Sequence, residues 1–235
     1  MLTVVCWKWR QPGYRQVYTA EHVNVLGRMI ERHLEIEHEL VCVTDDPAGI
    51  DGHIRIVPLW AEHGDVANPS SPEGPSCYRR LRMFEPGAAA WLGERILSID
   101  LDMVITGPLA PLVDRAEDFV AMGDTARSTA YNGSLILLRA GSRPQVWEQF
   151  DAAASPAATR AARMVGSDQA WISHVLGPGE ATWSKADGVY SFRNDLSRSR
   201  GPLPEGALVV NFHGHWKPWH GAVQADHRWV LDHWR

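Results

Sequence analysis

The first part of the chain alternates short apolar runs with one amphipathic segment. Residues 2–6 are apolar and partly β-branched, which predicts a buried strand. Apolar residues then recur at helical spacing over 23–34, and Thr19 precedes them as a candidate N-cap. Apolar runs at 39–44 and 54–59 predict two more strands. Strand, helix and strand in this order predict a βαβ unit, which favours a parallel sheet with right-handed crossovers.

The remainder of the chain continues this alternation with less regular spacing. Polar, Pro-containing segments at 67–75 and 193–204 predict loops. Because no internal repeat and no interdomain linker stands out, we expect one α/β domain over residues 1–235 with a mixed, mostly parallel central sheet. Its further elements are predicted as strands at 95–99, 119–122, 134–138 and 207–212, and as helices starting at 78 and spanning 145–153 and 170–176.

The composition excludes several classes of protein. With 45% hydrophobic and 22% charged residues, a chain of 235 residues can bury a core and does not resemble a disordered chain. A net charge of -5 gives no overall cationic field that would attract nucleic acid or an anionic membrane. Cys6, Cys42 and Cys77 form neither a disulfide framework nor a CxxC metal knuckle. No apolar run suits a signal peptide or a membrane span, so we expect a cytoplasmic protein.

Two carboxylates follow the apolar strand predicted at 95–99. Asp100 and Asp102 are separated by one residue where that strand leaves the sheet, and open α/β sheets bind ligands beyond the carboxyl ends of their strands. Hard divalent cations take oxygen ligands, so this pair is placed to hold Mg²⁺ or Mn²⁺. A surface turn also produces the same spacing by chance. The apolar strand argues for the metal site, because buried acids are costly unless they are paired or bound to a metal.

A second candidate site lies in the sequence VVNFHGHWKPW at 209–219. His213 offers a nitrogen ligand to the same metal, Gly214 lets the backbone approach an anion closely, and Lys217 supplies a positive charge for phosphate. The alternative is a histidine-containing turn packed beneath Trp216 and Trp219. The histidine spacings in this part of the chain match no tetrahedral zinc pattern, so no structural zinc site is expected.

Several separated motifs occur in an order that characterises one family. They are Y-x-R-L at Tyr78, Arg80 and Leu81, an L-D-x-D-x-x-V strand end at 98–104, an F-N-S-G-V turn at 131–135 with Gly and Ser exchanged, a D-Q element within 166–169, and G-x-x-K-P-W at 214–219. Over residues 78–219 the chain thereby resembles the nucleotide-sugar-dependent glycosyltransferases with the GT-A fold, especially those of family 8 and related small phage and bacterial proteins.

This resemblance implies a GT-A domain with Mn²⁺ or Mg²⁺ as cofactor. Residues 1–105 would form the nucleotide-binding βαβ half, and residues 106–235 the acceptor-side half with the C-terminal metal and phosphate loop. Asp100 and Asp102 would hold the metal. The catalytic residues that the resemblance implies are Asn132, Asp168 and Gln169. The donor-binding residues that it implies are Arg80, Ile99, Asp100, Leu101, Ser134, Gly214 and Lys217.

The chain departs from the family pattern at one metal ligand. In family 8 this ligand is a histidine three residues before the glycine of the C-terminal loop, and Asn211 stands there in this chain. His213 lies two residues along the same predicted strand and hence on the same face, so we expect His213 to be the third metal ligand, with Asn211 as the alternative.

The N-terminal third resembles the family only in its βαβ pattern. Trp7, Lys8 and Trp9 follow the first strand, where a GT-A domain holds the nucleotide base, and an indole there could stack on uracil. We therefore expect these three residues to bind the donor. The alternative of equal weight places Trp7 in the core and Trp9 on the surface.

The expected reaction is transfer of a hexose from a nucleotide-diphosphate sugar, most simply a UDP-sugar, to a hydroxyl acceptor. Metal and Lys217 would stabilise the leaving phosphate, while Asn132, Asp168 and Gln169 would orient the sugar. The resemblance implies retention of the anomeric configuration. Asp168 is the only candidate covalent nucleophile, and front-face displacement within an ion pair is equally open.

The acceptor is either a saccharide or small hydroxyl compound, which the acidic net charge favours, or a 5-hydroxymethylated base in DNA. The DNA alternative rests on interleaved aromatic and basic residues at 7–15 and on Arg79, Arg82, Arg193, Arg198 and Arg200. Two other functions compete. A non-catalytic carbohydrate-binding module would explain the eleven tryptophans. A sugar nucleotidyltransferase would normally carry a Gly-rich phosphate loop after the first strand, and residues 7–13 do not form one.

Overall fold

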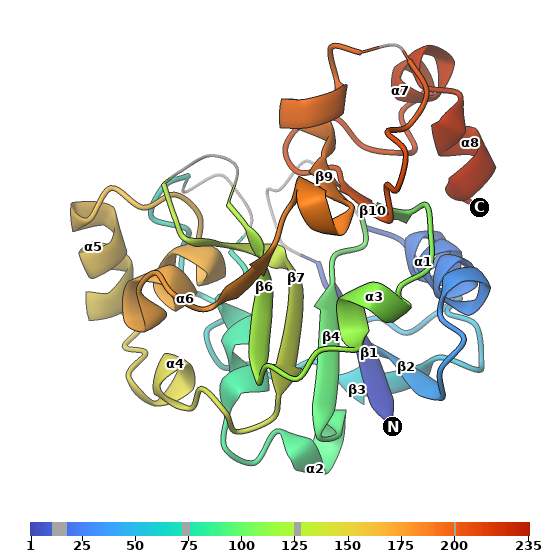
Figure 1. Ribbon diagram of the computed structural model, residues 1–235. Coiled ribbons are helices and arrows are strands. Elements are labelled where there is room, and N and C mark those ends of the chain that lie inside the picture. The colour runs from blue at the N-terminus through green and yellow to red at the C-terminus, as the bar shows by residue number, and fades with distance from the viewer. Residues whose placement is uncertain (11–17, 72–75, 125–127, 200) are drawn as a thin grey trace.

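The computed structural model describes residues 1–10, 18–71, 76–124, 128–199 and 201–235. Within these residues the main feature is a seven-stranded sheet in the order β3-β2-β1-β4-β7-β6-β8 (Figure 1). Pairs β1–β2, β1–β4, β2–β3 and β6–β8 are parallel, whereas β7 runs antiparallel to both β4 and β6. The predicted mixed, mostly parallel sheet is therefore confirmed. Its strands are β1 (Leu2–Lys8), β2 (His38–Thr44), β3 (Arg55–Pro58), β4 (Arg95–Ile99), β6 (Phe119–Gly123), β7 (Tyr131–Arg139) and β8 (Ala181–Trp183).

The N-terminal βαβ unit forms as the sequence pattern predicts. Helix α1 (Ala20–His33) connects β1 to β2, and Thr19 precedes it in extended conformation. The Thr19 backbone N–H donates to Nδ1 of His22 at 2.8 Å, which satisfies one of the groups that a helix start leaves open. Val23, Leu26 and Ile30 recur on one face of the helix and are fully buried.

A second, smaller sheet accompanies the large one. It has the order β5-β10-β9 and is formed by β5 (Met103–Ile105), β10 (Val209–Asn211) and β9 (Val189–Ser191). Strand β10 pairs antiparallel with β5, which directly follows the two aspartates after β4. The small sheet therefore brings the C-terminal part of the chain beside Asp100 and Asp102.

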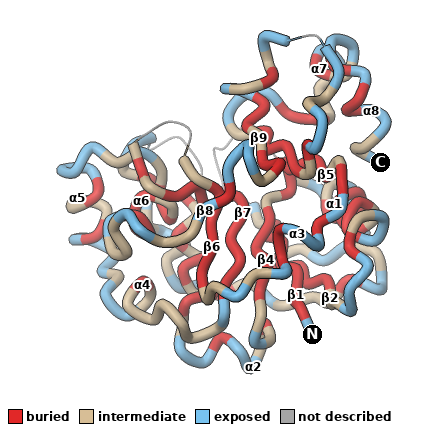
Figure 2. The backbone as a smooth tube through the Cα atoms, in the orientation of Figure 1, coloured by how far each residue is buried: buried red, intermediate tan, exposed pale blue. Residues whose placement is uncertain are grey.

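Two hydrophobic clusters cover the two faces of the large sheet. Successive residues of β1 point to opposite faces, so Val4 and Cys6 belong to one cluster while Val5 and Trp7 belong to the other. The first cluster also includes α1 and the small sheet, and the second includes the helical segments around residues 78–84 and 168–176. Figure 2 shows the central strands as the most continuously buried part of the chain.

The helices differ from the sequence predictions in length and type. The predicted helix from residue 78 is a 3₁₀ helix, η1 (Tyr78–Phe84), and the one predicted at 145–153 is only one turn long, α4 (Gln145–Glu148). The predicted loop at 193–204 contains most of a π-helical turn, η3 (Phe192–Leu196). The others are α2 (Ala89–Leu92), α3 (Ala110–Val113), α5 (Ala154–Ala161), α6 (Asp168–Leu176), η2 (Lys185–Asp187), α7 (Gly221–Asp226) and α8 (Trp229–His233).

The C-terminal segments gather at one end of the large sheet. In Figure 1, η3, β9, β10, α7 and α8 lie together in orange and red beyond the strands. Among the helices of the described ranges, none combines the length and the apolar character that crossing a bilayer requires.

Two glycines that precede strands of the small sheet, Gly188 before β9 and Gly206 before β10, give a matched test of the packing there. Gly188 and Gly206 have nearly the same left-handed φ, +78° and +77°, but a Cβ on Gly188 would lie 2.5 Å from the carbonyl oxygen of Gly206, whereas nothing lies within 4 Å of one on Gly206. Both Ala substitutions cost about 1–2 kcal/mol for the backbone conformation. We expect Gly188→Ala to lower the free energy of unfolding by roughly a further 1–3 kcal/mol through overpacking. Equal losses in urea denaturation would contradict this packing.

Candidate active site

The two aspartates lie where β4 leaves the large sheet. The backbone N–H of Asp100 donates to the carbonyl oxygen of Ser134 in β7 at 2.9 Å, which fixes the turn that follows the strand. Asp102 precedes β5, and its carbonyl oxygen accepts the N–H of Phe212 at 3.2 Å. Asp102 is only 4% exposed. The predicted carboxylate pair therefore stands where the two sheets meet, with Asp102 buried and the side chain of Asp100 25% exposed.

Arg80 of η1 joins one of these carboxylates to a third. Its Nε and Nη2 donate to Oδ2 of Asp168 at 2.9 and 2.5 Å, and its Nη1 donates to Oδ1 of Asp100. Asp168 is the first residue of α6, so the motifs around residues 80, 100 and 168 converge as predicted. Arg80 and Asp168 are both buried.

The structure explains why Gly and Ser are exchanged in the motif at 131–135. A Cβ on Gly133 would lie 3.0 Å from both Nη2 of Arg80 and Oδ2 of Asp168, so a side chain there would crowd this ion pair. The next residue, Ser134, places its side chain in a hydrogen bond with Asp100. Glycine at 133 therefore leaves this ion pair uncrowded, and the hydroxyl at 134 contacts Asp100.

Lys217 reaches the second aspartate from the C-terminal loop. Its Nζ donates to Oδ2 of Asp102 and, at 3.1 Å, to the carbonyl oxygen of Phe212. Gly214 of the same loop has a φ of +84°, which favours glycine. Tyr18, just before α1, also donates its hydroxyl to Oδ2 of Asp102 at 3.1 Å. The sequence analysis missed Tyr18, because no motif or periodicity marks a loop residue that meets its partner only in the folded chain.

The charges of this cluster do not balance. Asp100, Asp102 and Asp168 contribute three carboxylates, and Arg80 and Lys217 contribute two cations. Burial raises the pKa of Asp100 above its ordinary value, although the neighbouring Arg80 acts in the opposite direction. The cluster therefore has room for further positive charge.

Two buried oxygens in this region have no hydrogen-bond partner in the part of the chain that the structure describes. Within the described residues, Oδ1 of Asp102 and Oδ1 of Asn211 are buried and accept no hydrogen bond. Their residues are neighbours in the fold, because Asn211 in β10 pairs with Met103 of β5, the residue after Asp102. Oxygen atoms are the ligands that Mg²⁺ and Mn²⁺ prefer, so these residues fit a divalent cation. The described residues contain no group of three or more His, Cys, Asp or Glu suited to a metal, so a cation held here would need ligands of another kind as well, such as the amide oxygen of Asn211.

His213, the predicted third metal ligand, has another partner. Its Nε2 lies 2.7 Å from Oγ of Ser191 in β9. Burial lowers the pKa of His213, and Arg193 adds to this effect. The geometry favours the alternative ligand, Asn211, over His213.

The two remaining predicted catalytic residues differ in their surroundings. Asn132 is buried beside the cluster, where its Oδ1 accepts the N–H of Ser134 at 2.9 Å and lies 3.5 Å from Nδ2 of Asn211. Gln169 is partly exposed, and its Nε2 donates to the carbonyl oxygen of Val165 at 3.0 Å. Asn132 thus belongs to the same hydrogen-bonded group as Asn211, whereas Gln169 in this structure turns away to its own helix start.

The residues predicted at the first strand end are held separately from the carboxylates. Trp7 is 6% exposed, donates from Nε1 to Oγ of Ser98 at 2.8 Å and packs edge-on against Trp60. Lys8 is buried and pairs with Asp46. These contacts favour the core alternative for Trp7.

Three other predicted donor residues present little side chain to a ligand at this end of the sheet. Trp9 is half-buried and packs against the second core cluster. Ile99 and Leu101 are buried in the first cluster, so only their backbone groups could face a donor. Residues 11–15 and Arg200, which contributed to the predicted basic groove, lie outside the described residues.

Comparison with known proteins supports the fold. No protein-family model and no curated protein matches the sequence. The galactosyltransferase LgtC, solved with donor and acceptor sugar analogues, matches 98% of this chain over 96% of its own, with 15% identity and a TM-score of 0.61. The glycosyltransferase GlyE from Streptococcus pneumoniae matches the whole chain over 62% of its own length, with 12% identity and a TM-score of 0.62.

A third solved structure has the same character. The bifunctional glycosyltransferase WbbM matches 98% of this chain over half of its own length, with 13% identity and a TM-score of 0.57. At such low identity the likeness establishes the fold. The chain has the GT-A fold that the motifs predicted, with the predicted motif residues at the end of its central sheet.

The Arg80 network predicts a large stability effect. Arg80→Gln removes the cation that pairs Asp100 and Asp168 while leaving both carboxylates in place, and breaking a buried pair in this way costs about 3–5 kcal/mol. The control is Arg28→Gln, which breaks the exposed pair with Glu21 and costs no more than about 1 kcal/mol. Urea denaturation at neutral pH measures both. Equal losses would show that Arg80 does not neutralise the two carboxylates.

Proposed function

We propose that this protein is a metal-dependent glycosyltransferase that moves a hexosyl group from a nucleotide-diphosphate sugar, a UDP-sugar in the simplest case, to a hydroxyl acceptor. The observation that carries the proposal is the pair of buried, unpartnered oxygens of Asp102 and Asn211 beside Lys217. A non-catalytic carbohydrate-binding module gives no reason for this cluster, and a sugar nucleotidyltransferase would normally carry a Gly-rich phosphate loop after the first strand, which residues 7–13 do not form.

The resident cation in this proposal is Mn²⁺ or Mg²⁺. Asp102 and Asn211 would hold it through their Oδ1 atoms, and Asp100 stands beside them with one oxygen engaged by Arg80. When bound, the cation supplies Lewis-acid neutralisation of the leaving diphosphate. Asn211 then takes the place of the histidine that the family resemblance leads one to expect.

Lys217 supports departure of the nucleotide diphosphate. Cleavage of the glycosidic bond leaves negative charge on the phosphate, and a preorganised cation in a dry site stabilises that charge strongly. Lys217 is 3% exposed and held by the carbonyl oxygen of Phe212, so its ammonium group is fixed before the reaction. The left-handed turn at Gly214 leaves the backbone open for close approach of a phosphate.

Asp168 and Asn132 bind the transferred sugar in this proposal, with Gln169 at the start of the same helix. Arg80 donates twice to Oδ2 of Asp168, which fixes the position of this carboxylate and occupies one of its two oxygens. This arrangement suits a group that accepts hydrogen bonds from sugar hydroxyls better than it suits a nucleophile. We therefore propose retention of configuration by front-face displacement, with the acceptor hydroxyl attacking the face that the diphosphate leaves.

Metal-dependent binding of the donor nucleotide tests the ligand set. We expect UDP to bind in calorimetry only when Mn²⁺ is present, and Asp102→Asn to abolish this binding. Asn211→Ala removes a metal ligand and should weaken Mn²⁺ binding at least about tenfold, as losing an interaction worth about 1.4 kcal/mol does. His213→Ala serves as the matched control, since Ser191 holds that imidazole, and should change the affinity for Mn²⁺ little.

If instead His213→Ala loses its affinity for Mn²⁺ and Asn211→Ala retains it, the third metal ligand is His213 and not Asn211. Absence of metal-dependent binding for UDP, GDP and CDP alike would contradict the proposed function itself.

The role of Lys217 is tested by turnover. We expect Lys217→Met to lower kcat for hydrolysis of a UDP-hexose about 10²–10³-fold, the usual cost of removing one preorganised group at a developing negative charge. Lys185→Met changes an exposed lysine elsewhere and should leave kcat as it is. An unaltered kcat in Lys217→Met would show that Lys217 does not stabilise the leaving diphosphate.

A further inference from the structure

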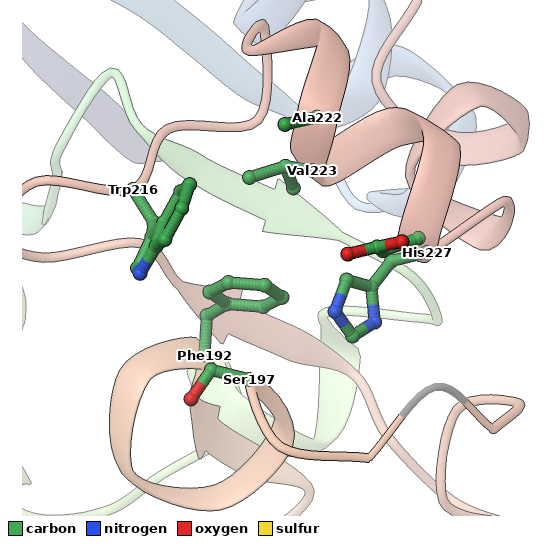
Figure 3. Close-up of a pocket in the computed structure, with 7 residues that line it drawn as sticks. Phe192, Ser197, Trp216, Ala222, Val223 and His227 are labelled. Atoms are coloured by element: carbon green, nitrogen blue, oxygen red, sulfur yellow. The ribbon is translucent and has the colours of Figure 1, made fainter.

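A separate cavity lies in the C-terminal part of the fold. Its volume is about 140 Å³, and it is formed between η3, α7 and the loop that carries Lys217. Figure 3 shows the side chains around it, with Trp216 on one side, Phe192 below and His227 opposite. The residues used in the argument below are Phe192, Ser197, Trp216, Val223, Asp226 and His227. None of them belongs to the carboxylate cluster.

The apolar side of the cavity is rigid and partly open to solvent. Trp216 is 42% exposed and is the only aromatic residue among the large hydrophobic side chains exposed in the described ranges. Phe192 stacks on Phe212 with ring centroids 4.2 Å apart and an interplanar angle of 15°, which fixes its ring. Val223 of α7 is buried and completes this side.

The remaining side of the cavity is polar. Asp226 carries a carboxylate at the exposed end of α7, and His227 a largely buried imidazole. The hydroxyl of Ser197 already donates to the carbonyl oxygen of Arg193 at 2.7 Å. An apolar wall with a few polar groups opposite it is the usual form of a site for a small ligand. A carboxylate and an imidazole can form hydrogen bonds with a ligand rich in hydroxyl groups, whereas the negative carboxylate would repel a ligand rich in phosphate groups.

The size of the cavity limits the occupant to a single ring. An apolar cavity of about 150 Å³ accommodates benzene, so this space admits one six-membered ring. The ring of a pyranose fits this space, while its hydroxyl substituents would extend through the side that is open to solvent at Trp216. The ring presents C–H groups on one face for an aromatic side chain. Such a ring matches both sides of the cavity.

The cavity is also linked to the proposed reaction centre. Trp216 immediately precedes Lys217, which contacts Asp102. The two neighbouring side chains lie in different environments: that of Lys217 is buried, and that of Trp216 is exposed. One short loop therefore joins the cavity wall to the group that would stabilise the leaving phosphate.

We propose that this cavity is a subsite that binds one pyranose ring of a saccharide acceptor, with Trp216 as the stacking residue and Asp226 as the principal hydroxyl acceptor. The proposal rests on the proposed glycosyltransferase function and selects a saccharide over a hydroxymethylated DNA base. Trp216 is then a residue that determines acceptor specificity.

The test compares sugar binding and nucleotide binding in the same variants. The sugar probes are the methyl α- and β-pyranosides of glucose and galactose, followed by saturation-transfer NMR, and UDP with Mn²⁺ is followed by calorimetry. We expect Trp216→Ala to weaken binding of the responding pyranoside at least about tenfold, and Trp216→Phe to restore most of it. Leu231→Ala, which alters an exposed apolar residue on α8, is the control and should bind as the parent protein does.

The two proposals fail in distinguishable ways. The subsite proposal is overturned if UDP binds with Mn²⁺ but the parent protein binds no pyranoside, or if Trp216→Ala binds the pyranoside as tightly as the parent protein does. A 5-hydroxymethylcytosine oligonucleotide that binds the parent protein and loses affinity in Trp216→Ala overturns it in favour of nucleic acid. Loss of UDP binding in the parent protein overturns the proposed function itself.

Discussion

The pairing of three carboxylates, two of them buried and the third partly buried, with two buried cations is the constraint on which the rest of the site depends. Asp100, Asp102 and Asp168 are held close to Arg80 and Lys217, and neither cation can leave without stranding charge in the interior. Buried polar groups that find no partner are rare in folded proteins. The unpartnered oxygens of Asp102 and Asn211 are therefore the strongest indication that the site is built for a ligand that carries positive charge.

The fold brings these groups together from distant parts of the chain. Strand β4 delivers the two aspartates at the end of the large sheet, and β5 leads directly from them into the small sheet. Strand β10 then returns the C-terminal segment to this point, which places Asn211 beside Asp102 and lets Lys217 reach it. The same C-terminal segment forms the cavity lined by Phe192 and Trp216. The C-terminal segment that follows β10 thus contributes to both the proposed donor site and the proposed acceptor subsite.

Much of this arrangement could be predicted from the sequence, because long periodic segments and short polar motifs leave local signals. The βαβ opening and the convergence of the motifs around Arg80, Asp100 and Asp168 were predicted. Three-residue strands such as β5, β8 and β9 leave no readable period and are stabilised by tertiary pairing. Trp7 was ambiguous because successive strand residues face opposite sides, and only the packing against Trp60 decides its direction. Tyr18 and Ser191 acquire their roles only from contacts across the folded chain.

The most direct test of the central claim is the thermal stability of the purified protein as a function of Mn²⁺ concentration, for the parent chain and for Asp102→Asn. A ligand that binds only the folded state at a hundred times its Kd stabilises it by about 2.7 kcal/mol. The account predicts that Mn²⁺ raises the Tm of the parent chain in a saturable manner and leaves the Tm of Asp102→Asn unchanged. The same response in both proteins, or no response in either, would contradict a divalent-cation site at Asp102.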